Sequence, residues 1–380
     1  MHPLIVLSIL LTLATANLTA RASTACNNSP DLCTRSYSSI THLGAHDSPF
    51  VRDATTGDSV SGNQYYNSTV QLDAGVRLLS TQVHRHNNDW HLCHSSCNLL
   101  DAGLLSSWLG KIKIWLDNNP NDVVTVLLVN SDNATPAQLH SEFVTANITS
   151  YAYKPASSSI PPSWPTLQTL ISANTRLMVF VASIPNRSSI PADQAYLMDE
   201  FTFIFENPFQ NNAPTSFTCT PDRPTAVKGQ PQIAVNSGRM PLMNHFLYRT
   251  GVLDIETPDV GNITLTNSPG SSVTGQLGKS LANCKGAYGK APTFVLVDFF
   301  DQGPAIDAVD AINGITPVGR KAVPARDTKT SRADSTFAGV KALVEQIRSG
   351  LGGNITRADW IWAAGKWSLG GVNMKTGKFT

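Results

Sequence analysis

Histidines are the residues in this 380-residue sequence whose positions most directly indicate chemistry. Most of the nine lie at or just beyond the ends of apolar runs: His42, His46, His84, His86, His91 and His94. In a parallel α/β fold the carboxyl ends of the strands face the ligand crevice, so histidines from adjacent strands would converge there. The sequence therefore predicts a site at which imidazoles meet.

Two imidazoles on either side of a pocket suit phosphodiester cleavage, because one takes a proton from an attacking hydroxyl while the other gives one to the leaving oxygen. The base needs a group that orients it. Asp298 is a carboxylate inside an apolar run, and burying it is costly unless it has a partner, for which a histidine is suited. The alternative is that Asp298 caps a loop and that single histidines bond only to the backbone.

Apolar runs recur along the chain with helical or loop segments between them, as a parallel α/β architecture requires. The expected strands are 39–45, 76–83, 123–130, 176–183, 201–206, 242–248 and 294–300. Apolar residues at helical spacing predict a crossing helix over 108–116, with Ser106 or Ser107 as its cap. This alternation fits a closed (β/α) barrel or an open doubly wound sheet, and the number of strands favours the barrel.

The N-terminus carries an apolar run at 4–16 followed by small residues, which predicts a signal peptide over residues 1–20 and a secreted, extracellular protein. An uncleaved anchor is the alternative. A single domain would then cover 26–380 and end in a helix, from the periodic apolar residues at 337–351. After secretion, seven Asn-x-Ser/Thr triplets become candidate glycan acceptors: Asn27, Asn67, Asn133, Asn147, Asn186, Asn262 and Asn354.

Six cysteines in an oxidising compartment suggest disulfide pairing. Proximity in the sequence favours three pairs: Cys26 with Cys33, Cys93 with Cys97, and Cys219 with Cys284. The alternative is a zinc site, because His91, Cys93, His94 and Cys97 form a tight His/Cys cluster.

The composition excludes several classes of protein. Hydrophobic residues make up 41% of the chain, which excludes a disordered protein. Lys plus Arg (28) nearly balances Asp plus Glu (27), so no overall field attracts nucleic acid. The chain lacks G-x-S-x-G, H-E-x-x-H and G-x-G-x-x-G motifs, which removes the main sequence support for an α/β-hydrolase esterase, a zincin or a dinucleotide enzyme.

Several motifs in order along the chain resemble the phosphatidylinositol-specific phospholipase C X-domain-like phosphodiesterases. They are GAHDS at 44–48, QLDAGVRLL at 71–79, LCH at 92–94, VVTVLL at 123–128 and LVDFF at 296–300, and the likeness spans most of 35–310. The cysteine-containing stretch 93–103 is similar to the secreted fungal branch. The resemblance implies a distorted TIM barrel with His46 as general base, His94 as general acid, Asp298 orienting the base and Asp47 assisting the acid.

The chain departs from this family at Ser80-Thr81-Gln82. Bacterial members carry Asp-x-Arg there and calcium-dependent animal members Glu-x-Asp, so the arginine that stabilises the phosphate charge and the calcium ligands are both missing. We expect no metal or cofactor. His84 or Arg85 is then the candidate for charge stabilisation, and Gln82 and Asn244 are further candidate substrate-binding residues.

The leading hypothesis is a secreted phosphoric diester hydrolase that cleaves a phosphodiester next to a polyol hydroxyl, with an inositol phospholipid at a membrane surface as the expected substrate class. Neither nucleic acid nor a stable protein partner is expected. One alternative is a catalytically lapsed barrel that binds a carbohydrate or a lipid headgroup. Another is a metallo-phosphodiesterase that uses Asp47, His84 and His86, since His-x-His can grip a transition metal.

Overall fold

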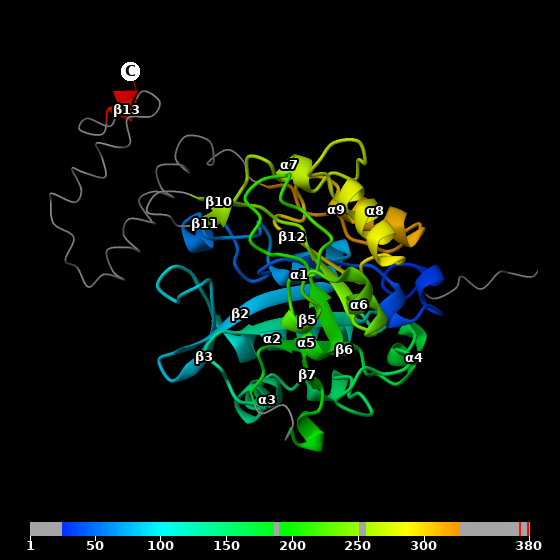
Figure 1. Ribbon diagram of the computed structural model, residues 1–380. Coiled ribbons are helices and arrows are strands. Elements are labelled where there is room, and N and C mark those ends of the chain that lie inside the picture. The colour runs from blue at the N-terminus through cyan, green and yellow to red at the C-terminus, as the bar shows by residue number, and fades with distance from the viewer. Residues whose placement is uncertain (1–24, 186–189, 251–255, 327–371, 374–377, 380) are drawn as a thin grey trace, which may run out of the picture.

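The computed structural model describes residues 25–185, 190–250, 256–326, 372–373 and 378–379, and its centre is a curled parallel sheet (Figure 1). Neighbouring strands follow the order β7-β6-β5-β2-β1-β12-β9-β8, and each pair is parallel. Their bounds are β1 (His42–Ala45), β2 (Leu78–His86), β5 (Val124–Asn130), β6 (Leu177–Ala182), β7 (Leu197–Asp199), β8 (Ile204–Glu206), β9 (Met240–Asn244) and β12 (Phe294–Val297). The predicted distorted barrel is confirmed, and the open doubly wound sheet is wrong.

The barrel is interrupted between β7 and β8. Among the described residues these strands form no ladder, and α5 (Glu200–Phe203) joins one directly to the other. The expected strand over 201–206 is therefore wrong in its first half. Asp199 accepts a hydrogen bond from the backbone N of Thr202 at 2.9 Å, and this cap turns the chain into one helical turn before β8 begins.

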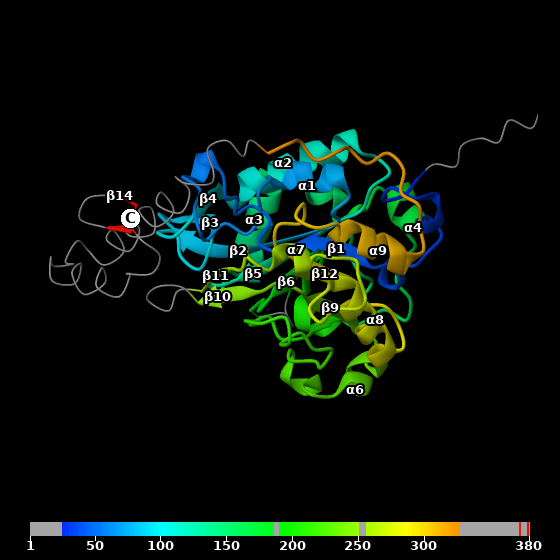
Figure 2. The ribbon, with the colours of Figure 1, turned by 90° about the horizontal axis from the view of Figure 1, so that it is seen from above.

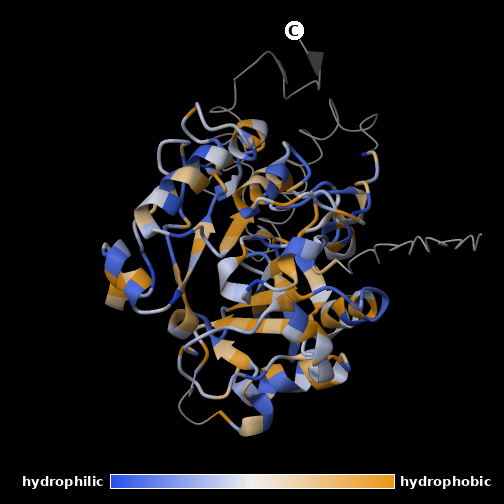
Figure 3. Ribbon diagram, turned by 90° about the vertical axis from the view of Figure 1, so that its right-hand side faces the viewer, coloured by the Kyte–Doolittle hydropathy of each residue, from blue (hydrophilic) through white to orange (hydrophobic). Residues whose placement is uncertain are grey.

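Both faces of the sheet are buried, which explains why its strands read as continuous apolar runs. Leu78, Leu242 and Leu296 point into the barrel and join one core cluster. Their neighbours on the other face, such as Leu79 and Val295, belong to a second cluster under the helices. Figure 3 shows hydrophobic residues concentrated along the central strands.

Gly44 on β1 lies close against two leucine side chains from the neighbouring strands. A Cβ atom at this position would lie 2.7 Å from Cδ2 of Leu296 and 2.8 Å from Cδ2 of Leu78. The absence of a side chain lets the flanking strands β12 and β2 place their leucines against β1.

Helices cover the outer face of the sheet (Figure 2). The longest, α2, confirms the predicted crossing helix, but its N-cap is Leu104, which makes no side-chain cap bond, so the expected serine cap is wrong. The α-helices besides α5 are α1 (Ser68–Ala74), α2 (Leu105–Asn118), α3 (Pro136–Thr145), α4 (Leu167–Ser172), α6 (Pro231–Asn236), α7 (Ile263–Thr266), α8 (Leu277–Tyr288) and α9 (Ala305–Asn313). Short 3-10 turns are η1 (Pro30–Leu32), η2 (Tyr37–Ser39), η3 (Ala54–Thr56), η4 (Thr149–Tyr151), η6 (Ala192–Gln194) and η7 (Thr225–Val227).

Two antiparallel additions extend from the sheet on the same side of the molecule (Figures 1 and 2). Strand β2 continues past the barrel and pairs with β3 (Asp89–Cys93), which in turn pairs with β4 (Asp101–Leu104). The second addition is the hairpin of β10 (Tyr248–Thr250) and β11 (Glu256–Pro258). Near the C-terminus, β13 (Val372–Asn373) pairs with β14 (Lys378–Phe379).

All three predicted disulfides are present: Cys26–Cys33, Cys93–Cys97 and Cys219–Cys284. The zinc alternative at the His/Cys cluster is therefore wrong, because both of its thiols are oxidised. The predicted signal peptide and C-terminal helix lie outside the described residues, as do the sequons at Asn186 and Asn354. Within the described ranges, none of the helices combines the length and apolarity needed to span a bilayer.

Candidate active site

His46 and Asp298 lie side by side at the carboxyl ends of β1 and β12. The backbone N of His46 donates to the carbonyl oxygen of Val297 at 2.9 Å, which continues the ladder between these strands. The side chains then meet, with His46 Nδ1 2.9 Å from Oδ1 of Asp298. Asp298 is 1% exposed, so the predicted buried carboxylate has a histidine partner, and capping a loop is not its main contact.

His94 reaches the same place from the end of β3. Its Nε2 lies 3.7 Å from Oδ2 of Asp47, and Nε2 of His46 lies 3.7 Å from that same oxygen. The edge of His94 packs against Phe50, with ring centroids 5.4 Å apart. The structure thus brings together His46, His94, Asp47 and Asp298, which the sequence proposed as one group.

Asp47 is held between the two rings by its backbone and by Gln82. Its φ of 47° lies in the left-handed region, which aspartate tolerates better than most residues, and its backbone N donates to Oγ of Ser80 at 3.0 Å. The Gln82 amide donates to Oδ2 of Asp47 at 2.8 Å and accepts from the backbone N of Ser95 at 2.9 Å. Gln82 therefore links Asp47 to the residue after His94.

The two histidines have opposite electrostatic tendencies. Burial disfavours the charged form of His46, but the charges of Asp47 and Asp298 and the hydrogen bond to Asp298 outweigh it and raise the pKa of His46. For His94, burial is the largest influence, the charge of Asp47 only partly offsets it, and the pKa of His94 is lowered. Protonation of the free site is therefore more favourable at His46 than at His94.

Two aromatic side chains that were not predicted as site residues wall the site: Phe246, between β9 and β10, and Tyr248, the first residue of β10. Phe246 stacks on His46 with ring centroids 3.7 Å apart and planes inclined by 5°. Tyr248 meets His46 edge-on at 6.4 Å. Burial, followed by the charges of Asp298 and Asp47, raises the pKa of Tyr248 well above its usual range, so its hydroxyl keeps its proton and can donate it in a hydrogen bond.

Asn244 belongs to the inward-facing row of β9 that continues to Phe246. Its amide donates to Oε2 of Glu206 at 2.7 Å and to the carbonyl oxygen of Asn207 at 3.0 Å. The other Glu206 oxygen is 2.6 Å from Nε of Arg223, whose guanidinium is 4.6 Å from the centre of the Phe209 ring. Burial raises the pKa of Glu206, although Arg223 and Asn244 oppose this. The predicted residue Asn244 thus hydrogen-bonds to a buried acid, Glu206, which was not predicted as a site residue.

His84 and Arg85 lie on the projecting part of β2. His84 Nδ1 is 3.4 Å from Oδ1 of Asp132, and the Arg85 guanidinium lies 5.2 Å from the centre of the Trp90 ring. In the described part of the chain, neither side chain hydrogen-bonds or pairs with the central four residues. Their role in charge stabilisation stays a prediction.

The donor set for the metal alternative is not assembled. His84 pairs with Asp132, the His86 ring stands edge-on to His91 at 5.2 Å, and Asp47 lies between the two central histidines. Among the described residues, no three His, Cys, Asp or Glu side chains are arranged to hold a metal ion.

Asn63 and Gln64 are further residues at the site that sequence reasoning missed. The Asn63 amide donates to Oδ1 of Asp298 at 3.0 Å, and the Gln64 amide donates to the backbone carbonyl of His46 at 2.8 Å. Both precede α1 in a polar loop, where no local pattern distinguishes them.

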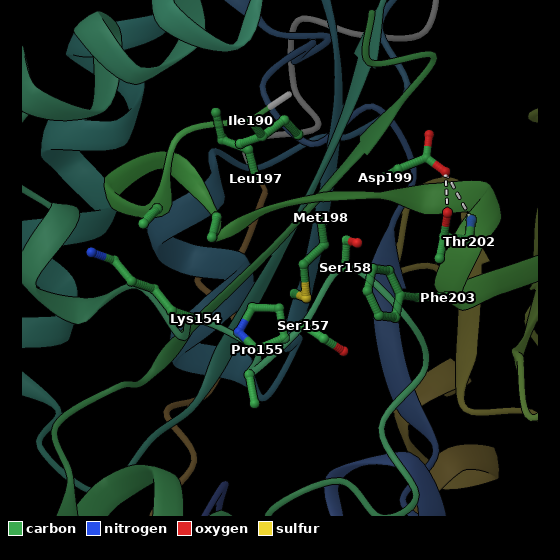
Figure 4. Close-up of a pocket in the computed structure, with 13 residues that line it drawn as sticks. Lys154, Pro155, Ser157, Ser158, Ile190, Leu197, Met198, Asp199, Thr202 and Phe203 are labelled. Atoms are coloured by element: carbon green, nitrogen blue, oxygen red, sulfur yellow. Dashed lines mark hydrogen bonds between the residues drawn. The ribbon is translucent and has the colours of Figure 1, made fainter. Parts of the chain in front are cut away.

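A cavity of 610 Å³ lies elsewhere, beside β7 and α5 at the interruption of the barrel (Figure 4). Leu197, Met198 and Phe203 contribute apolar lining, and Lys154 lies at one side. Its described lining contains none of the residues predicted for the site, so this cavity is separate from the histidine cluster.

Comparisons with known proteins show the family of the chain. The family model described as PI-PLC X 1 matches residues 32–313. "PI-PLC X domain-containing protein 1" of Arthroderma benhamiae is 37% identical over 292 residues, which cover 76% of this chain and 90% of that protein. An "Uncharacterized secreted protein" of the same fungus is 34% identical over 303 residues, which cover 78% of this chain and 65% of that protein.

Among solved structures, phosphatidylinositol-specific phospholipase C from Listeria monocytogenes superposes with a TM-score of 0.51. The match covers 74% of this chain and 95% of that one at 15% sequence identity, so it concerns the fold. From the extent of the family match and the identity to the first fungal relative, this chain belongs to the PI-PLC X-domain family.

Proposed function

We propose that the protein is a secreted phosphodiesterase of the phospholipase C type that cleaves a phosphodiester next to a polyol hydroxyl. The observation that carries the proposal is that Nε2 of His46 and Nε2 of His94 each lie 3.7 Å from one oxygen of Asp47. Two imidazoles so placed can contact the attacking and the leaving oxygen of a single phosphorus. The family membership and the barrel fold support the same class of reaction. A relative named as secreted supports secretion.

In the proposed step, a hydroxyl next to the phosphodiester attacks phosphorus and loses its proton to Nε2 of His46. The new oxygen–phosphorus bond closes a cyclic phosphodiester as the bond to the leaving alcohol breaks. His94 donates its proton to that leaving oxygen. His46 can act through Nε2 because its Nδ1 is engaged with Asp298.

Asp47 would assist the acid. Its charge favours protonation of His94, against the burial that lowers the pKa of that ring. The competent form has His46 neutral and His94 protonated, which is the reverse of the preferred state of the free site. A bound phosphodiester anion next to His94 would favour moving the proton there.

The headgroup would lie toward β8 and β9. Glu206 and Asn244 offer a carboxylate and an amide, and Tyr248 adds a hydroxyl beside His46. Polyol hydroxyls both donate and accept hydrogen bonds, so this mixed set suits them. We extend the proposed substrate-binding set from Gln82, His84, Arg85 and Asn244 to include Glu206 and Tyr248.

A second candidate function is headgroup binding without cleavage. The observation that favours it is at Gln82, which stands where bacterial relatives carry the phosphate-stabilising arginine and whose amide is engaged by Asp47 and Ser95. A site without that cation could bind a polyol phosphate without lowering the activation barrier for phosphodiester cleavage.

The test is turnover of a panel of soluble inositol and glycerol phosphodiesters, with and without a chelator. We expect the wild type to cleave one class in either condition and His46→Ala and His94→Ala each to lose about 10²- to 10⁴-fold in rate. His140→Ala is the matched control. His140 lies on α3, and its Nδ1 is 2.9 Å from the Tyr196 hydroxyl, so its hydrogen bond is made outside the site. Wild-type rates in either site variant would refute the assignment, and loss of activity with the chelator would refute a metal-free mechanism. Tight binding of inositol phosphate by a wild type without turnover would support the second candidate.

A further inference from the structure

We propose that Asn63 is a positioning residue that holds the His46 and Asp298 side chains in their working arrangement. The inference deepens the proposed function and rests on it for its catalytic meaning. Asn63 is fully buried, and its side chain is directed at both members of the pair.

The three side chains form a closed triangle. Nδ2 of Asn63 lies 3.0 Å from Oδ1 of Asp298 and 3.3 Å from Nδ1 of His46, and the latter two atoms are 2.9 Å apart. A carboxylate oxygen only accepts hydrogen bonds, so both nitrogens donate to it. The proton of a neutral His46 is therefore on Nδ1, which leaves Nε2 bare and able to act as a base.

Asn63 is one of only two donors in the described part of the chain that reach the Asp298 carboxylate. Oδ2 of Asp298 is buried without a hydrogen-bond partner among the described residues. The carboxylate therefore depends on His46 and Asn63, both of which act on Oδ1. Without Asn63, a buried charge would be left with a single neighbour.

The Asn63 backbone is tied to the segments that carry the pair. Its N donates to the carbonyl oxygen of Phe50, in the loop after β1, at 2.8 Å. Its own carbonyl accepts from the N of Phe299, the residue after Asp298, at 2.8 Å. These two bonds fix the direction from which the Asn63 amide approaches.

The next residue completes the brace between the strand ends. The fully buried Gln64 donates from its amide to the carbonyl oxygens of His46, at 2.8 Å, and Val297, at 3.1 Å. Its amide oxygen accepts from the N of Phe300 at 3.2 Å. Gln64 thus fixes the backbones at the ends of β1 and β12, while Asn63 fixes the side chains that they carry.

The Asn63 amide also opposes protonation of His46. The groups that face this ring are Asp47 beside it, Asp298 from β12, His94 from β3 and Tyr248 from β10. The Asn63 N–H presents the positive end of its dipole to the ring and competes for the Asp298 oxygen. Without this amide, the effect of the Asp47 and Asp298 charges on His46 is less opposed, so the protonated form of His46 is favoured and its pKa rises.

The test compares Asn63→Leu and Asn63→Asp with the wild type by NMR titration of the His46 ring and by the pH profile of kcat/KM. We expect a higher His46 pKa in Asn63→Leu and a still higher one in Asn63→Asp, which adds a negative charge. A rise of about one unit lowers the competent fraction, and hence kcat/KM, about tenfold between the two histidine pKa values. It also moves the alkaline limb of the profile to higher pH and leaves the acid limb in place.

Asn313→Ala is the control. Asn313 is buried and makes two bonds to the backbone of Thr41 at the other end of β1, at 2.9 and 2.8 Å. Its loss should lower stability without moving the His46 titration. An unshifted His46 titration in Asn63→Asp, which is nearly isosteric and serves if Asn63→Leu does not fold, would overturn the inference. The NMR titration needs no turnover. If the wild type is inactive but the His46 pKa is shifted in Asn63→Asp, the proposed function is refuted while the positioning role of Asn63 is supported.

Discussion

A histidine lies at each end of β1, since His42 is its first residue and His46 follows its last, and the pKa values of the two rings are shifted in opposite directions. His42 is buried among aromatic rings, with Nε2 3.2 Å from the backbone carbonyl of Tyr37, and burial lowers its pKa to about 4. His46 is 12% exposed, and the carboxylates of Asp47 and Asp298 raise its pKa. The two rings differ in their partners, a neutral carbonyl for His42 and two carboxylates for His46, and a neighbouring negative charge favours the charged form of an imidazole.

The largest expected effect separates the two rings by function. His46→Gln should lower turnover about 10²- to 10⁴-fold, because the base is lost. His42→Gln keeps an amide donor near the Tyr37 carbonyl and should leave turnover nearly unchanged. Steady-state kinetics on both variants, with circular dichroism as the folding control, checks this. Equal losses of turnover in His46→Gln and His42→Gln would contradict the assignment of the base to His46 alone.

The next effect is on stability in acid. His42 and His245 have folded pKa values of about 4 against an ordinary 6.5, so the unfolded chain binds protons first as the pH falls. Each should cost about 3 kcal/mol between pH 6.5 and 4. His46 acts oppositely, since its stabilisation is complete below pH 6.5 and is lost as the pH rises through its raised folded pKa.

Urea unfolding at pH 7.5 and pH 4.5 measures this loss. His42→Gln removes one of the two groups and should lose about 2 to 3 kcal/mol less than the wild type over that interval. A variant that weakens in acid as much as the wild type would show that His42 is not held neutral.

The smallest effect lies between the two histidines, at Gly44. Gly44→Ala would put a Cβ atom 2.7 Å from Leu296 and should destabilise the fold by about 1 to 3 kcal/mol. Because the leucine side chains can shift, turnover per folded molecule should fall much less than in His46→Gln. Chemical denaturation together with kcat checks both parts, and an unchanged midpoint would mean that the barrel interior has room to spare.

The convergence of strand-end histidines at one edge could be predicted from topology, whereas the pairing of Asp298 with His46 in particular was implied by the family resemblance. Parallel neighbours place their carboxyl ends at one edge, so residues just beyond two apolar runs meet there wherever those strands are adjacent. The rule did not place Asn244, because the expected strand over 242–248 puts this residue in its middle, whereas β9 ends at Asn244. Proximity along the chain sufficed for the three disulfides.

Groups brought in by loops could not be predicted. Asn63, Gln64 and Arg223 reach the site through irregular segments whose paths depend on long-range contacts, and nothing in their local sequence indicates where they end. Phe246 and Tyr248 were inside an expected strand, but their stacking on His46 depends on how β9 bends into β10.

Strand length bears on two of the expectations. Alternation correctly puts Gln82 and His84 on one face of β2. Each further pair of residues advances the strand by about 7 Å, however, so His84 and Arg85 lie in the β2–β3 hairpin, beyond the cluster of His46, His94, Asp47 and Asp298. Residues 201–206 alternate like a strand, yet the Asp199 cap just before them makes the first half helical. A six-residue window gives too little evidence to decide between these outcomes.

His94 owes its position to a small covalent ring. The Cys93–Cys97 bridge closes a loop of a few residues around it, and Ser95 inside that loop is pinned by Gln82. A turn this short keeps little freedom once it is cross-linked, so it behaves as a rigid mount rather than a flexible loop. The loop that carries His94 therefore depends on a bond that persists only under oxidising conditions, and correct oxidation becomes a condition for assembling the site.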